Sequence, residues 1–218
     1  MTKPNVPFFF GFERADSVSL DPHKWLYAPL DCGCLLFRDE AKARVAFGDE
    51  DADYIKVLEQ DADESFAFWN YGPELSRRFR ALKIWLTLRY YGVRRIAAAI
   101  TEDNALAGYL AGLVEQAEDF ELLSQPQLSI CCFRYVPQAR RLQSAGRPLE
   151  NEDELNRLNQ KIMHAVQRGG RAYLSSATIH GKFALRACIT NFRTTRADIA
   201  QTLEIIRAAA KGIYGSAA

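Results

Sequence analysis

The chain has 218 residues, and its 28 lysine and arginine side chains nearly balance its 27 aspartate and glutamate side chains. This balance creates no basic field that would favour nucleic acid or an anionic membrane surface, so we expect neither as a partner. Hydrophobic residues make up 48% of the chain, enough for one large or two small folded domains. No apolar run approaches the ~20 residues of a spanning helix, and residues 1–7 lack a signal-peptide pattern, so we expect a cytoplasmic protein.

Five cysteines, an odd number in apolar contexts, favour reduced thiols over a disulfide framework. Cys32 and Cys34 fall on one face of an expected strand. Because no second Cys or His pair stands at ligand spacing, we expect no metal site.

The stretch 17–38 (SVSLDPHKWLYAPLDCGCLLFR) contains the first candidate for chemistry. Its alternating start, 17–20, predicts a short strand, and the Pro-His-Lys tripeptide 22–24 predicts a tight turn. The turn leads to Lys24 between an imidazole and the indole of Trp25, surroundings that can favour a neutral, nucleophilic amine. The alternative is a surface lysine that only extends its charge into water.

This stretch resembles the pyridoxal-phosphate attachment signature of the group II amino-acid decarboxylases. The agreeing positions are Ser17, Val18, Lys24, Trp25, Leu26, Leu30, Cys32 and Arg38. The resemblance implies that Lys24 binds the cofactor covalently and that His23 contacts its phosphate. Asp21 occupies a cofactor-binding position where some members carry asparagine, and an acid there would repel a phosphate unless it points elsewhere.

An acidic segment, 46–63, follows and favours a mobile surface loop. Tyr54 stands out in it, either as a tyrosine packed on the surface or as a functional group. The resemblance implies the second reading, because family members use a tyrosine on a flexible loop at this distance to return a proton to the substrate carbon.

The run SRRFRALKIWLTLRYYG (76–92) predicts an amphipathic helix that stops at Gly92. Its basic residues are spread around the helix, which argues against a nucleic-acid reader. The run resembles a second motif of the family, in which Ser76 takes a substrate-binding position held by glycine or serine. In the plant branch serine accompanies phenolic substrates.

The C-terminal part predicts a small α/β layer. Its expected elements are helix 93–120, strand 128–136, helix 153–168, the antiparallel strands 171–178 and 182–189, and helix 197–210 with Thr194 or Thr195 as N-cap. Arg186 lies on the second strand of the pair. It is either a surface ion-pair partner or, as the resemblance implies, a substrate-binding arginine that faces the active site.

The resemblance therefore implies an α/β fold: the C-terminal part of a fold-type I large domain (1–120) followed by a small C-terminal α/β domain (121–218). It also implies decarboxylation of an aromatic L-amino acid by a homodimer. Family members carry a phosphate-binding loop, a ring-stacking histidine and an aspartate for the pyridine nitrogen upstream of this region. We therefore expect the chain to represent about the C-terminal half of such an enzyme and to be inactive alone.

Two alternatives stay open. The chain could belong to another fold-type I enzyme, such as an aminotransferase or an aldehyde synthase, or be a non-catalytic remnant. Aldehyde synthases typically carry phenylalanine at the loop position, so Tyr54 favours decarboxylation.

Overall fold

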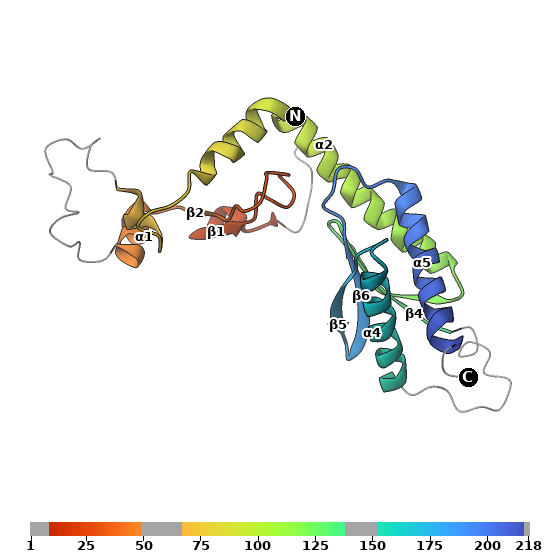
Figure 1. Ribbon diagram of the computed structural model, residues 1–218. Helices are drawn as coiled ribbons and strands as arrows, with labels where there is room; N and C mark the ends of the chain where they lie inside the picture. The colour runs from red at the N-terminus through yellow and green to blue at the C-terminus, as the bar shows by residue number, and fades with distance from the viewer. Residues whose placement is uncertain (1–8, 49–66, 138–151, 216–218) are drawn as a thin grey trace, which may run out of the picture. The chain divides into compact units, whose positions relative to one another are not determined.

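The computed structural model describes residues 9–48, 67–137 and 152–215. Of Tyr214 and Gly215 only the backbone is described. The chain divides into two compact units, Met1–Gly92 and Val93–Ala218 (Figure 1). They are called the first and second unit below. The domain boundary expected at residue 120 concerns the domains of the whole family fold and stays a prediction.

The first unit contains a small antiparallel ribbon. β1 (Ser17–Leu20) pairs with β2 (Cys34–Phe37), so that Ser17 lies opposite Phe37 and Leu20 opposite Cys34. The strand predicted at 17–20 is confirmed. Cys32 precedes β2 instead of lying within it, so the expected shared strand face of Cys32 and Cys34 is wrong.

Short helices complete the first unit. They are the 3-10 helix η2 (Phe12–Arg14), α1 (Glu40–Phe47) and the 3-10 helix η4 (Phe68–Tyr71). Asp39 caps α1, since its carboxylate accepts hydrogen bonds from the backbone N–H groups of Ala41 and Lys42.

The helix α2 (Arg80–Gln116) is interrupted at Gly92, whose φ of 74° and ψ of 154° are not helical. A positive φ of this size favours glycine, which explains why the predicted helix stop falls here. Helical structure resumes after Gly92 and ends at Gln116. The expected continuation to residue 120 is therefore wrong, and β3 (Phe120–Gln127) begins instead.

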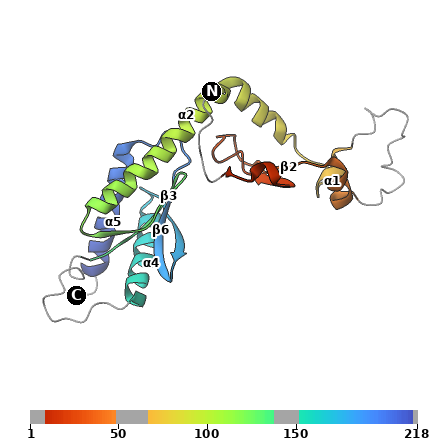
Figure 2. The same ribbon diagram turned by 180° about the vertical axis from the view of Figure 1, so that it is seen from behind.

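The second unit is built on a four-stranded antiparallel sheet of order β3-β4-β6-β5. Its other strands are β4 (Ile130–Tyr135), β5 (Ser175–Ile179) and β6 (Lys182–Cys188). Two helices, α4 (Glu152–Gly169) and α5 (Arg196–Gly215), lie side by side in both views (Figures 1 and 2). The predicted sequence of strand, helix, hairpin and helix is confirmed.

The core of this unit follows from strand alternation. Cys131 and Phe133 of β4 lie opposite Ala187 and Leu185 of β6, and all four belong to the buried cluster, which places them on one face of the sheet. Buried apolar residues of the helices complete the same cluster: Leu106, Leu110, Val114, Leu155, Ile162, Val166, Leu203 and Ile206. The sheet and the helices of the second unit therefore share a single hydrophobic core.

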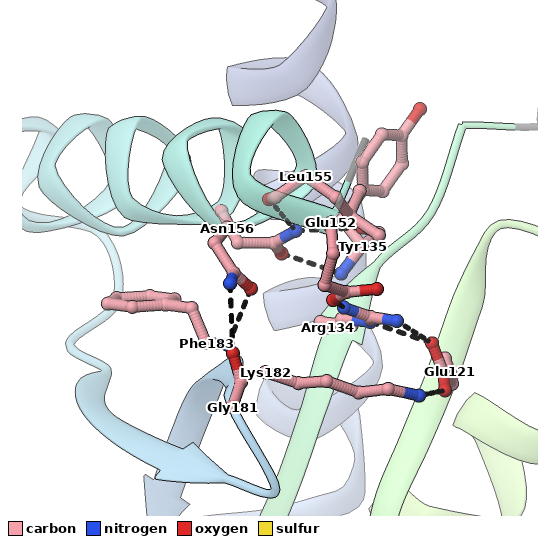
Figure 3. Close-up of polar contacts among 10 residues, drawn as sticks. Glu121, Arg134, Tyr135, Glu152, Leu155, Asn156, Gly181, Lys182 and Phe183 are labelled. Atoms are coloured by element: carbon pink, nitrogen blue, oxygen red, sulfur yellow. Dashed lines mark hydrogen bonds and ion pairs between the residues drawn. The ribbon is translucent and has the colours of Figure 1, made fainter. Parts of the chain in front are cut away.

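A charge network around the buried side chain of Arg134 ties the start of α4 to the sheet (Figure 3). The side chain of Arg134 is 3% exposed and contacts Glu121 on β3, at 2.6 Å from Nη2 to Oε2, and Glu152 on α4. Lys182 Nζ binds the other oxygen of Glu121 at 2.6 Å. Burial alone would raise the pKa of Glu121, but the hydrogen bonds from Lys182 and Arg134 outweigh it and lower this pKa.

Candidate cofactor site

The turn after β1 holds Lys24 by backbone hydrogen bonds. Lys24 N donates to the carbonyl of Asp21 at 2.9 Å, and Lys24 O accepts from the N–H of Tyr27 at 3.0 Å. The turn is closed once more by Ala28 N, which donates to Pro22 O at 3.1 Å. The Asp-Pro-His-Lys sequence thus forms the predicted tight turn, with its lysine in a fixed backbone position.

The ring of His23 is fixed by the backbone of Cys32. Its Nδ1 lies 2.6 Å from the carbonyl oxygen and 3.2 Å from the N–H nitrogen of Cys32. A neutral ring can donate to the first or accept from the second, depending on its tautomer. Either contact occupies Nδ1, so a ligand would meet the face of the ring or Nε2.

The side chain of Lys24 is 61% exposed, and its Nζ lies 2.6 Å from Asp21 Oδ2. The expected packing between His23 and Trp25 is therefore wrong: Lys24 points into solvent and pairs with an acid. The hydrogen bond from Lys24 holds the pKa of Asp21 below its usual range.

A second charged cluster surrounds Asp31, which sequence reasoning missed. Its carboxylate lies 2.8 Å from Arg78 Nη2, 3.4 Å from Arg80 Nε and 3.7 Å from Lys83 Nζ. Arg80 also binds Glu74 at 2.8 Å. The basic run 77–83 carries no sequence signal for an acid 47 residues earlier, so only the fold reveals this pairing.

A hollow of about 710 Å³ opens beside this cluster, lined in part by Cys32, Phe37, Tyr71, Arg78 and Phe79. Lys24 is not among its lining residues, so the hollow and the lysine are separate features of the first unit.

The remaining predicted site residues lie elsewhere. Ser76 is exposed just before α2. Arg186 lies on β6 in the second unit, where its Nη1 donates to Ser175 Oγ at 3.3 Å. Tyr54 is outside the described residues. The structure therefore brings together Asp21, His23 and Lys24, while the roles of Ser76, Arg186 and Tyr54 stay predictions.

The turn fits the attachment of an aldehyde cofactor. Lys24 offers an exposed primary amine on a backbone that hydrogen bonds hold in place, and an imidazole is its direct neighbour. This chemistry suits a group that binds through an amine and is held further by contacts to its ring or substituents.

Comparison with known proteins defines the class. Residues 1–136 match the family model described as the pyridoxal-dependent decarboxylase conserved domain. The chain therefore belongs to the pyridoxal-dependent decarboxylase family, and the predicted family and its pyridoxal-phosphate cofactor are confirmed.

Individual relatives support this family assignment. The chain is 36% identical over 203 residues to an aromatic-L-amino-acid decarboxylase of Bacillus atrophaeus, covering 93% of this chain and 40% of that protein. It is 36% identical over 182 residues to tyrosine decarboxylase 4 of Petroselinum crispum, covering 82% of this chain and 34% of that protein. The chain thus spans between about a third and two fifths of the length of these relatives, in their C-terminal part.

Solved structures confirm the predicted fold class. The structure of Oryza sativa TDC with pyridoxal phosphate and tryptamine has a TM-score of 0.78 at 28% identity, over 94% of this chain and 40% of that one. Mouse CSAD has a TM-score of 0.79 at 25% identity, over 94% of this chain and 42% of that one. In the part of the chain that the structure describes, no helix has both the length and the apolar character needed to cross a membrane.

Proposed function

We propose that this chain belongs to an enzyme that decarboxylates an aromatic L-amino acid to its amine and carbon dioxide. The main support is that the family match covers residues 1–136 and so includes Lys24. Lys24 lies on an exposed turn that backbone hydrogen bonds hold in place. The names of the similar proteins, aromatic-L-amino-acid and tyrosine decarboxylases, support the aromatic substrate class. We further propose a cytoplasmic homodimer, in line with the family resemblance.

Each residue of the proposed site would have its own role. Lys24 would hold the cofactor through Nζ, and His23 would contact it from the neighbouring position. When bound, pyridoxal phosphate supplies an electron sink for the charge left on the substrate carbon as the carboxylate departs. Tyr54 would deliver a proton to that carbon. Arg186 and Ser76 would bind the substrate.

The test is an assay of carbon dioxide release by the full-length protein with aromatic, acidic and basic L-amino acids. We expect release from aromatic substrates, with tyrosine preferred over tryptophan because Ser76 accompanies phenolic substrates in the plant branch. Release only from glutamate or a basic amino acid would overturn the substrate class, and no release from any of them would overturn the activity.

A second candidate function, aldehyde synthesis, is favoured by one comparison. The chain is 31% identical over 213 residues to a phenylacetaldehyde synthase of a Rosa hybrid cultivar. The same assay separates the two functions, because a decarboxylase yields an amine and an aldehyde synthase yields an aldehyde. We expect the amine from the natural sequence, and Tyr54→Phe should lower amine yield and raise aldehyde. An unchanged amine yield in Tyr54→Phe would mean that another group delivers the proton.

A further inference from the structure

The ion pair between Asp21 and Lys24 is built into the turn that presents the lysine. The backbone bond from Lys24 N to Asp21 O, 2.9 Å long, brings the first and last residues of the turn together. Their side chains then meet at 2.6 Å between Nζ and Oδ2, a distance typical of a charge-assisted hydrogen bond. His23 is the other titratable group of this turn, and its Nδ1 is occupied by Cys32.

This contact bears on the reactivity of the amine. Only the neutral amine has the lone pair that attacks an aldehyde, whereas an ammonium group is a donor without a lone pair. A carboxylate at hydrogen-bond distance stabilises the charged form and not the neutral one. While Nζ of Lys24 is engaged in this contact, it is therefore not free to attack an aldehyde.

We propose that Asp21 is a positioning residue that holds Nζ of Lys24 in this ion pair and keeps it from reacting with an aldehyde until the pair opens. The inference rests on the proposed function in one respect, that the aldehyde concerned is pyridoxal phosphate. In the reaction the ammonium loses a proton to solvent, a bond forms between Nζ and the aldehyde carbon, and the carbonyl oxygen leaves as water. Asp21 then acts on the lysine and not on the cofactor phosphate.

The test measures labelling of Lys24 in the full chain by pyridoxal, an aldehyde without a phosphate. Reaction at neutral pH is trapped with borohydride, and the label on each lysine is quantified by peptide mass spectrometry. Asp21→Asn should raise the initial rate of Lys24 labelling about threefold, the range expected for an exposed ion pair. Asp21→Glu, which keeps the charge, should return the rate toward that of the natural chain.

The pair of Asp39 and Lys42 provides a matched control. It has the same spacing of three residues, but its Nζ to Oδ2 distance is 3.8 Å. Asp39→Asn preserves the cap of α1, because asparagine caps helices as well as aspartate does. This variant should leave Lys24 labelling unchanged and alter Lys42 labelling less than Asp21→Asn alters that of Lys24.

Two readouts exclude a purely structural effect. The rate of Lys24 labelling in Asp21→Asn, divided by the rate in the natural chain, should fall to one at a pH at which a free lysine is neutral. A neutral amine has no ion pair to lose. Added salt should raise Lys24 labelling of the natural chain relative to Lys42, since salt screens exposed pairs. The salt readout needs no variant and so does not depend on whether Asp21→Asn folds.

The inference is overturned if Asp21→Asn leaves the pyridoxal labelling of Lys24 unchanged. It is also overturned if the variant speeds labelling by pyridoxal phosphate but not by pyridoxal, because Asp21 would then act by repelling the phosphate. Failure of the proposed function gives a different result. The cofactor would attach to another lysine of the full-length protein, while the effect of Asp21 on pyridoxal labelling of Lys24 would persist.

Discussion

Two asparagine side chains fix α4 to the sheet through hydrogen bonds to its backbone. Asn159 is fully buried, and its amide accepts from Tyr135 N at 2.8 Å and donates to Tyr135 O at 2.9 Å. Asn156, one turn earlier and only partly buried, accepts from Phe183 N at 2.7 Å and donates to Gly181 O at 3.0 Å. Each asparagine therefore satisfies backbone groups at the end of a strand, as a further strand would.

Replacement of the buried asparagine should cost more than replacement of the other one. Asn159→Ala leaves both backbone groups of Tyr135 without their partner in the protein interior, so we expect it to lower the free energy of unfolding by about 2 kcal/mol. Asn156→Ala, where water can replace the lost bonds, should lower it by about 1 kcal/mol. Urea unfolding followed by circular dichroism measures both, and equal losses would contradict the assigned roles.

At the candidate site, local sequence predicts some features of single residues, and others depend on the fold. The turn that holds His23 and Lys24 could be predicted because its motif is local in sequence. The exposure of Lys24 and its pairing with Asp21 could not, because they depend on how the turn closes in space. Asp31 could not be linked to Arg78 and Arg80 for the same reason, since a long loop of sequence separates the partners.

At the scale of elements, segments with strong periodicity or glycine boundaries could be predicted. The β5–β6 hairpin has Gly181 in its turn at a φ of 78°, and α4 has acids in its first turn and apolar residues on one side. β3 was missed because Glu118 and Asp119 continue the polar face of the preceding helix without a glycine or proline between them. The strand is specified by its long-range pairing with β4, which local sequence does not reveal.

The cap of α5 gives a prediction at this scale. The sequence left Thr194 and Thr195 as alternatives, and the structure selects Thr195. Its N–H donates to Asp198 Oδ2 at 2.9 Å, and Asp198 N donates to Thr195 Oγ1 at 3.3 Å. Thr195→Ala should therefore lower the free energy of unfolding by about 1 kcal/mol, while Thr194→Ala should have a smaller effect.

The stabilisation from this cap should depend on pH. Hydrogen bonds from the side chain and backbone of Thr195 hold the pKa of Asp198 below its usual range. The contribution is complete above the ordinary pKa of aspartate and is lost as the pH falls through the lowered value. The unfolding temperatures of the natural chain and of Thr195→Ala should thus lie closer together in acid than at neutral pH, while the bond from Asp198 N to Thr195 Oγ1 keeps them apart. A gap that widens as the pH falls would contradict this account of the cap.

At the scale of the whole molecule, the first unit exposes many large apolar side chains. Phe10 is 79% exposed, Phe79 75% and Trp85 57%. Apolar surface of this extent favours association with other protein surface. The chain also spans only about 40% of the Bacillus atrophaeus relative. Both observations support the expectation that this polypeptide needs further protein surface to act.

We therefore predict that the 218-residue polypeptide alone releases no carbon dioxide from any amino acid and binds pyridoxal phosphate weakly. The family resemblance assigns the phosphate loop and the partner of the pyridine nitrogen to a region upstream of Lys24, and these groups supply most of the binding and activation. Titration with pyridoxal phosphate, followed by visible absorbance, should show little difference between the natural chain and Lys24→Arg. Tight, stoichiometric binding that requires Lys24, together with amine production, would contradict this prediction.

The assignment of Lys24 as the attachment lysine is tested most directly by locating the cofactor on the protein. The full-length protein is incubated with pyridoxal phosphate, reduced with borohydride and digested, and the labelled peptide is sequenced by mass spectrometry. We expect the pyridoxyl group on Lys24. A label found mainly on Lys42, Lys56 or Lys83 would contradict it.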